Sequence, residues 1–108
     1  MCNQQRMFQA LILYEKFNPD FFIKINDNII IVEIKGDEDI SSPHPENVGK
    51  HIAGIEHVKL INQHLNEEKY KFTMLTPKNY PAFFESIRNN TILKFNSELD
   101  VEIEKGQG

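Results

Sequence analysis

Short apolar runs and alternating segments fill the first third of the chain, and both patterns predict β-strands. The strongest is residues 29–32, four consecutive β-branched residues of the kind that a sheet interior favours. An alternating segment precedes it, and the dipeptide Asn18-Pro19 before that segment breaks helices and favours an extended entry. We therefore expect strands at 10–17, 20–25 and 29–35, with the last two joined as a β-hairpin.

Apolar residues then recur every three or four positions, which is the period of a helix face turned toward a core. The residues concerned are Val48, Ile52, Ile55, Val58, Ile61 and Leu65. This spacing predicts a core-facing helix over 46–66, after a polar loop at 36–46.

The last third of the chain carries weaker patterns. The segment "YKFTML" at 70–75 predicts another strand, and the turn-rich residues after it lead into a helix predicted over 81–89. The alternation in "ELDVEI" predicts an edge strand at 98–103, and we expect a loose tail at 104–108. Together these elements predict an α/β fold with a mixed sheet: a three-stranded meander, a crossing helix, a further strand and a terminal helix.

The chain has 108 residues, the usual size of one domain, so we expect a single domain over 1–108 with its core at about 10–90. Apolar residues make up 40% and charged residues 26%, a balance typical of soluble proteins, and no apolar run is long enough to cross a bilayer. Residues 1–9 lack a signal-peptide pattern, and the one cysteine, Cys2, has no internal partner for a disulfide. These observations predict a cytoplasmic protein that has no membrane partner.

The net charge of −4 argues against a protein that binds nucleic acid through bulk electrostatics. Such binding depends on Lys and Arg releasing counterions from phosphates. Any contact with DNA therefore needs metal ions at an acidic site, or the help of another domain.

The charged end of the predicted hairpin carries the strongest chemical signal. Alternation places Glu33 and Lys35 on the same strand face. A two-residue turn at 27–28 would pair Asp20 with Lys35 and Phe22 with Glu33, which makes Asp20 a diagonal neighbour of Glu33 on that face. A slip of one residue would separate them.

Two carboxylates this close repel each other, and burial in a central strand would remove water from both, so a divalent cation relieves both costs. Because Asp20 and Glu33 offer only oxygen ligands, the pair favours Mg²⁺ or Mn²⁺ over zinc, with the backbone carbonyl of Ile34 as a third ligand. Lys35 would then stabilise charge beside the bound water or on a phosphate under attack. The alternative is a solvated sheet face, since an acid-x-Lys triplet is common in sequences of ordinary composition.

The segment "NPDFFIKINDNIIIVEIKGDED" resembles the PD-(D/E)XK nuclease superfamily. Together with "ENVGKHIAGIEHVKLIN" and "YKFTMLTPKNYPAFFESIR", it is similar to the C-terminal endonuclease domain of the helicase (Res) subunits of type III restriction enzymes, over about residues 18–90. The resemblance implies a restriction-endonuclease-like fold and a metal-dependent endodeoxyribonuclease that hydrolyses phosphodiester bonds with Mg²⁺. It assigns Asp20 and Glu33 as metal ligands and Lys35 as the catalytic lysine. It also implies DNA, a helicase/ATPase region and a methyltransferase (modification) subunit as partners.

The N-terminal end departs from this family. The superfamily core begins with a helix that often supplies another acidic ligand, whereas only residues 1–9 remain for that helix here, and they contain no Asp or Glu. We therefore expect a truncated first core helix, in a chain that is either a fragment of a longer helicase-nuclease or a shortened remnant. Glu15 is the nearest upstream acid, but it lies in the strand expected at 10–17.

Other polar residues are weaker candidates. Lys50 falls in the first turns of the expected long helix, where it could meet a DNA phosphate, while His51 is expected at the surface. His57 and His64 lack the cysteine or acid that would complete a zinc set with them. The acidic run at 37–39 suits a solvated loop better than a second metal site.

Phe83, Phe84 and Ile87 fit the packing stripe of the last helix rather than a surface for stacking bases.

Two functions other than a nuclease also fit the sequence. A non-catalytic nuclease-fold module could bind or brace a helicase or repair complex, which the missing first helix and the acidic balance favour. A small stand-alone protein whose hairpin charges are merely solvated is the other.

Overall fold

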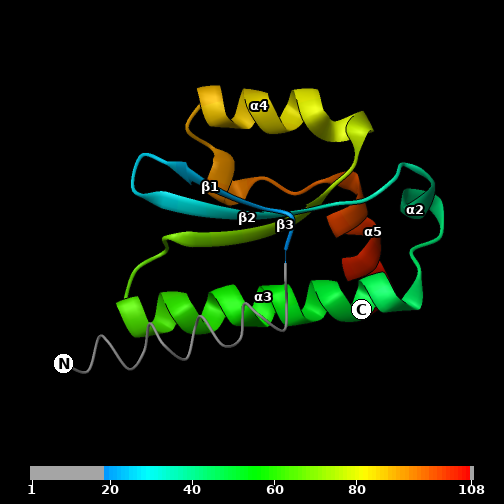
Figure 1. The fold of residues 1–108 in the computed structure, drawn as a ribbon, viewed down its shortest axis with the longest axis horizontal. Coiled ribbons are helices and arrows are strands. Elements are labelled where there is room, and N and C mark those ends of the chain that lie inside the picture. The colour runs from blue at the N-terminus through cyan, green and yellow to red at the C-terminus, as the bar shows by residue number, and fades with distance from the viewer. Residues whose placement is uncertain (1–18, 108) are drawn as a thin grey trace.

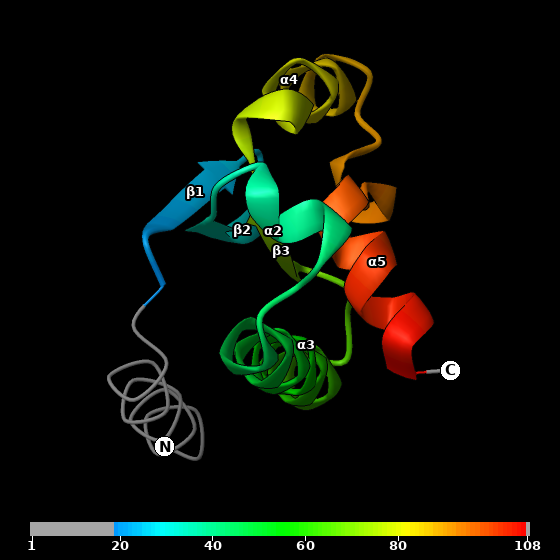
Figure 2. The ribbon, with the colours of Figure 1, turned by 90° about the vertical axis from the view of Figure 1, so that its right-hand side faces the viewer.

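The computed structural model describes residues 19–107 of the chain. Figure 1 shows the sheet between the long helix α3 and the shorter helix α4, and Figure 2 shows α5 beside the sheet. The strand predicted at 10–17, which includes Glu15, lies outside the described residues, as do Cys2 and the residues 1–9 expected to form a truncated first core helix. The elements are β1 (Phe21–Ile25), β2 (Asn28–Ile34), α2 (Glu38–Ser41), α3 (Pro45–Leu65), β3 (Tyr70–Leu75), the 3₁₀ turn η1 (Pro77–Asn79), α4 (Tyr80–Arg88), the 3₁₀ turn η2 (Ile92–Lys94) and α5 (Glu98–Gln107).

The sheet is mixed and has the strand order β1-β2-β3, in which β2 pairs antiparallel with β1 and parallel with β3. A mixed α/β fold is therefore confirmed. The hairpin is present, but the predicted register is wrong by two residues, because its turn is Asn26-Asp27 and Asn28 already pairs with Ile25. Asn26 adopts a left-handed backbone with φ of 56°, which Asn tolerates better than most residues. Since side chains alternate with a period of two, this shift leaves every residue on its predicted face.

The central strand β2 is buried on both faces, which is why its apolar residues are consecutive. On one face, Ile31 packs in a cluster with Val58 of α3 and Phe72 of β3. On the other face, Ile30 packs in a cluster with Phe83 of α4. The sheet thus separates two small cores, one under each helix layer.

Helix α3 occupies the predicted range but turns a different face to the interior. Val58 is buried as predicted, whereas Ile52, Ile55 and Leu65 are exposed, so this part of the prediction is wrong. The buried residues of α3 are Asn47, His51, Gly54, His57, Val58 and Asn62. Hydrogen bonds explain why this face of α3 is buried, because polar side chains of the helix bond to groups on β3 and α5. The spacing of apolar residues does not predict such bonds.

Asn62 illustrates the point at the outer edge of β3. Its Oδ1 accepts the backbone N–H of Tyr70 at 2.8 Å, and its Nδ2 donates to the carbonyl of the same residue at 2.9 Å. One side chain thereby satisfies both edge groups of Tyr70 as a neighbouring strand would. This contact holds the C-terminal half of α3 against the start of β3.

The C-terminal segment is helix α5, so the edge strand predicted at 98–103 is wrong, and the tail predicted to be loose at 104–108 is helical as far as Gln107. Leu99, Val101 and Ile103 alternate as they would in a strand. Only Leu99 and Ile103 are buried, however, and residues four apart share one helix face.

A capping box explains why this segment is helical. Ser97 Oγ accepts the backbone N–H of Asp100 at 3.0 Å, and Asp100 Oδ2 accepts the backbone N–H of Ser97 at 3.1 Å. These reciprocal bonds satisfy two backbone donors that the first helical turn otherwise leaves without partners. These capping bonds favour a helix, and the segment is helical although its apolar residues alternate as in a strand.

The other predicted elements agree with the structure to within a few residues. Strand β3 matches 70–75, and α4 begins one residue before the range predicted. Phe83 is buried and Ile87 partly buried against the sheet, but Phe84 is exposed and does not belong to the packing stripe. The loop expected at 36–46 contains the one-turn helix α2. Among the described residues, no helix is long and apolar enough to cross a membrane.

Candidate functional site

Glu33 and Lys35 extend the central strand on the side of the sheet that faces α3. Ile31, which shares this face by alternation, packs with Val58 of α3. Glu33 is only 8% exposed, and the Lys35 Nζ lies 3.4 Å from Glu33 Oε2. The structure therefore brings an acid and an ammonium together at the point where the apolar part of β2 ends.

The second oxygen of Glu33 has a different environment. Glu33 Oε1 is buried and accepts no hydrogen bond from any residue in the range 19–107. A charged oxygen that has lost water without gaining a donor raises the free energy of the folded state. This oxygen is consequently a ready acceptor for a cation.

Asp20 lies immediately before β1, at the open end of the hairpin. Its side chain is exposed, and its Oδ2 accepts the backbone N–H of Ile34 at 2.7 Å. If the observed pairing continues beyond β1, Pro19 stands opposite Ile34, and the Asp20 carboxylate takes the place of a ladder acceptor there. Asp20 thus has a structural contact through Oδ2, while its Oδ1 makes no hydrogen bond with any of the residues that the structure describes.

The corrected register changes how the three charged residues meet. The predicted pairing of Phe22 with Glu33 is wrong, because Phe22 lies opposite Ile31. By the same register Asp20 lies opposite Glu33 instead of Lys35, so the two carboxylates are direct rather than diagonal neighbours across the hairpin. Their common face is the one predicted.

The donor set suits a hard cation that retains water. No group of three or more His, Cys, Asp or Glu side chains in the described part of the chain is arranged to hold a metal ion. Asp20, Glu33 and the Ile34 carbonyl therefore offer two side chains and one backbone oxygen. Mg²⁺ is commonly bound by one or two carboxylates while water and substrate phosphate complete its octahedral shell, so these residues fit Mg²⁺ better than zinc.

Two weaker candidates occupy surface positions near α2 and α3. Lys50 Nζ lies 3.9 Å from Glu46 Oε1, one turn earlier in the helix. Asp37 Oδ1 accepts the backbone N–H of Lys78 at 2.9 Å, which fastens the acidic run 37–39 to η1. That hydrogen bond is the main reason why the pKa of Asp37 is lowered. The contact gives Asp37 a structural role.

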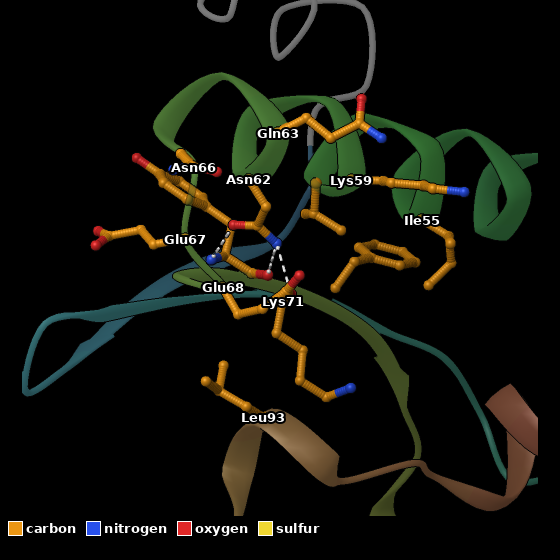
Figure 3. Close-up of a pocket in the computed structure, with 12 residues that line it drawn as sticks. Ile55, Lys59, Asn62, Gln63, Asn66, Glu67, Glu68, Lys71 and Leu93 are labelled. Atoms are coloured by element: carbon orange, nitrogen blue, oxygen red, sulfur yellow. Dashed lines mark hydrogen bonds between the residues drawn. The ribbon is translucent and has the colours of Figure 1, made fainter.

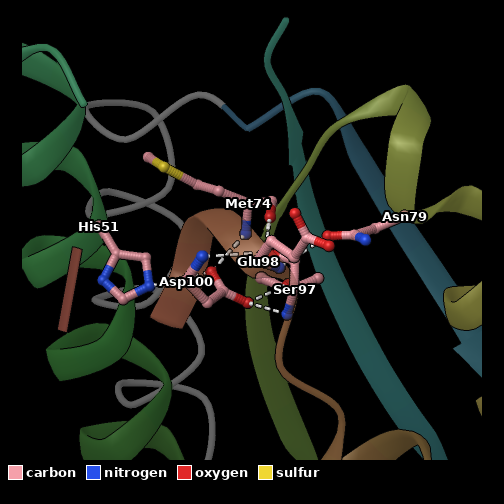
Figure 4. A network of polar contacts seen from close by, with 7 residues as sticks. His51, Met74, Asn79, Ser97, Glu98 and Asp100 are labelled. Carbon is pink, nitrogen blue, oxygen red and sulfur yellow. Dashed lines mark hydrogen bonds and ion pairs between the residues drawn. The ribbon is translucent and has the colours of Figure 1, made fainter. Parts of the chain in front are cut away.

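A buried polar network, which was not predicted from the sequence, lies where α5 meets α3 and β3 (Figure 4). His51, predicted at the surface, is 2% exposed, and its Nε2 lies 3.0 Å from Asp100 Oδ1. The prediction is wrong because α3 presents this histidine to α5. The Asp100 carboxylate also accepts hydrogen bonds from the Thr73 hydroxyl and from the backbone N–H groups of Met74 and Ser97.

The hydrogen bonds to Asp100 decide its charge state. Burial, the largest single influence, would raise the pKa of Asp100, but the bonds from His51, Thr73 and the backbone together outweigh it, so this pKa is lowered. Asp100 therefore remains a charged, fully engaged structural group. The one sequence signal for it was the Ser-x-x-Asp spacing of residues 97–100, which is typical of a capping box.

Comparison with known proteins adds no assignment to this site. No protein-family model matches the chain. No curated protein matches it, and no solved structure does. The hairpin geometry and the motif on the hairpin are therefore the features that indicate a function.

Proposed function

We propose that the chain is a Mg²⁺-dependent DNA endonuclease domain of the PD-(D/E)XK kind, which hydrolyses phosphodiester bonds. The observation that carries this proposal is the buried Glu33, whose Oε1 has no hydrogen-bond partner among the described residues while Lys35 lies 3.4 Å from Oε2. Asp20 faces Glu33 across the hairpin when the observed register is continued. A pair of acids with an ammonium alongside is a suitable arrangement for metal-assisted attack on a phosphodiester.

Each residue has a defined role in this proposal. Asp20 and Glu33 hold the metal, and the Ile34 carbonyl adds a third oxygen. At this position Mg²⁺ would lower the pKa of a water and would offset charge on the phosphate. The ion pair with Glu33 restrains Lys35, whose partly buried ammonium can then stabilise the negative charge that develops on the phosphate oxygens.

The order of elements supports the same family. A hairpin that bears the acids is followed by the crossing helix α3 and by the parallel strand β3, which is the order that the motif resemblance implies for this part of a restriction-endonuclease-like fold. DNA binding by a chain of net charge −4 requires help. In the proposal this help comes from Mg²⁺, from Lys50 as a candidate phosphate contact, and from the helicase/ATPase region and methyltransferase subunit of a cytoplasmic restriction system.

One contact favours a second function. Asp20 Oδ2 already accepts the backbone N–H of Ile34, and this hydrogen bond closes the end of β2 without any metal. If that is the whole role of Asp20, the chain is a non-catalytic nuclease-fold module that binds or braces a helicase or repair complex. Such a module would keep the hairpin but would not bind a divalent cation at Glu33.

Cleavage of plasmid DNA by the intact protein with Mg²⁺ tests the nuclease assignment. Lys35→Ala and Asp20→Asn should each lower the cleavage rate by about a hundredfold or more, the loss typical of removing one group that stabilises the transition state. Lys24→Ala is the matched control, because Lys24 is an exposed lysine on β1, and its variant should cleave at the wild-type rate. Unchanged cleavage by Lys35→Ala or Asp20→Asn would show that the assignment is wrong.

A further inference from the structure

A pocket of about 630 Å³ lies between the C-terminal half of α3, the start of β3 and η2. Figure 3 shows α3 on one side of this pocket and Leu93 of η2 on the other. Its apolar lining consists of Ile55, Val58, Tyr70, Phe72 and Leu93. We call it the β3 pocket.

The β3 pocket is separate from the hairpin site. Tyr70, which lines the pocket, is the first residue of β3 and pairs with Ile29 at the start of β2. Glu33 pairs with Met74 near the other end of the same parallel pair. The pocket and the acids therefore lie toward opposite ends of the sheet, so a ligand of the β3 pocket can bind whether or not the hairpin site is a nuclease.

Lys71 extends from β3 into the pocket (Figure 3), and this residue is partly buried. Its ammonium makes no hydrogen bond or ion pair with any residue of the described part of the chain. Burial lowers the pKa of Lys71, although the carboxylates of Asp100 and Glu104 act in the opposite direction. An ammonium that has lost water without gaining a close anion is destabilised in its charged form, and a bound anion would relieve that cost.

The charges around the pocket are unevenly arranged. Lys59 of α3 also lines it and makes no ion pair within residues 19–107. Of the two acids in the lining, Glu68 already accepts a hydrogen bond from Asn62 Nδ2 at 3.3 Å. Figure 3 places Glu67 at the far end, beyond Asn62 from the Lys71 ammonium. The end of the pocket near Lys71 therefore combines a cation with apolar walls.

We infer that the β3 pocket binds a small carboxylate with an apolar body, paired through its carboxylate with Lys71 and packed against Ile55 and Leu93, which are both exposed apolar side chains of the lining. The pairing is a charge-assisted hydrogen bond in a partly desolvated place, where such bonds are strong. Burial of the aliphatic or aromatic part against these walls adds affinity and selects against hydrophilic anions. Lys59 contributes a second positive charge at the rim.

Three matched probes test this inference on the intact chain by ¹H–¹⁵N chemical-shift titration at pH 7. Hexanoate has both the charge and the apolar body, hexan-1-ol has only the body, and acetate has only the charge. Hexanoate should shift the amides of Tyr70, Phe72 and Leu93 and bind about tenfold more tightly than either of the others. Equal binding of hexanoate and hexan-1-ol, or no saturable shifts at these residues, would overturn the inference.

Substitution separates the ammonium from the rest of the pocket. Lys71→Met keeps an unbranched apolar side chain, and it should weaken hexanoate about tenfold while leaving hexan-1-ol unchanged. Lys24→Met removes an exposed lysine of β1 and should change neither. The wild type offers a test that needs no variant. Hexanoate should raise the pKa of Lys71, which the side-chain ¹³C shifts of Lys71 report. The other charged groups near Lys71 also influence this pKa and are present with and without hexanoate: Lys59, Glu67, Glu68, Asp100 and Glu104. An unchanged Lys71 pKa at saturating hexanoate would rule out the proposed pairing.

Discussion

Two buried carboxylates, Asp100 and Glu33, lie in opposite electrostatic surroundings. Asp100 is 1% exposed, and its two oxygens accept four hydrogen bonds from α3, β3 and the residue that caps α5. Glu33 is 8% exposed and has the Lys35 ammonium at one oxygen, while no donor within the described residues reaches the other. The two carboxylates are therefore similarly buried, but both oxygens of Asp100 have hydrogen-bond donors, whereas only one oxygen of Glu33 has a positively charged partner.

The difference separates a structural acid from a candidate functional one. Most buried polar atoms in folded proteins have a hydrogen-bond partner, so an exception calls for an explanation. Asp100 needs none, because its bonds join three elements and start a helix. Glu33 retains an unused negative oxygen beside Lys35 and, in the continued register, across from Asp20, and the proposed divalent cation would give that oxygen a partner.

Removal of the Asp100 carboxylate should produce the largest loss of stability. Asp100→Ala leaves His51 and the N–H groups of Met74 and Ser97 buried without their acceptor, so we expect the free energy of unfolding to fall by about 3–5 kcal/mol. Urea unfolding followed by circular dichroism measures this loss.

A milder variant keeps that experiment interpretable. Ser97→Ala removes only the hydroxyl, which accepts the Asp100 N–H and donates to the Met74 carbonyl, and it should cost about 1–2 kcal/mol for the lost helix cap and the lost hydrogen bond. A loss for Asp100→Ala no greater than that for Ser97→Ala would contradict the view that the network anchors α5.

Acid should expose the same network through a pH dependence. Because the folded pKa of Asp100 is lowered, its contribution to stability is complete above the unfolded value of about 3.9 and is lost as the pH falls through the folded pKa. The free energy of unfolding of the wild type should therefore drop more steeply below about pH 4 than that of Asp100→Asn. Parallel profiles for the two proteins would argue against a charged Asp100 in the folded state.

Neutralising Glu33 should have the smallest effect on stability. Glu33→Gln removes a buried charge whose Oε1 has no hydrogen-bond partner among the described residues, and it also removes the ion pair with Lys35, so the two changes oppose each other. We expect the free energy of unfolding, measured by urea unfolding, to change by less than about 1 kcal/mol. A loss as large as that of Asp100→Ala would mean that Glu33 is a structural acid as well.

The sequence predicted the hairpin face better than its register. Alternation alone placed Asp20, Glu33 and Lys35 on one face, and the error of two residues in the turn did no harm, since strand faces repeat every two residues. Whether the turn falls at Asn26 or one residue later depends on which asparagine takes the left-handed backbone. Composition does not distinguish these possibilities.

The helices show where hydrophobic spacing fails. Alternating Leu99, Val101 and Ile103 suggested a strand, whereas the capping box of residues 97–100 makes the segment helical. The spacing in α3 gave its range but not its buried face. That face is chosen by hydrogen bonds such as those of Asn62 with Tyr70, 8 positions away, and of His51 with Asp100, 49 positions away. The apolar spacing within α3 contains no information about partners outside the helix.

Binding of Mn²⁺, a paramagnetic substitute for Mg²⁺, tests the central claim most directly. Electron paramagnetic resonance of free Mn²⁺ at pH 7 should reveal a saturable site in the wild type that Glu33→Gln loses. It should persist in Glu56→Gln, which neutralises an exposed acid of α3 and so controls for the change in net charge. Equal binding by the wild type and Glu33→Gln, or no saturable site in the wild type, would contradict the account.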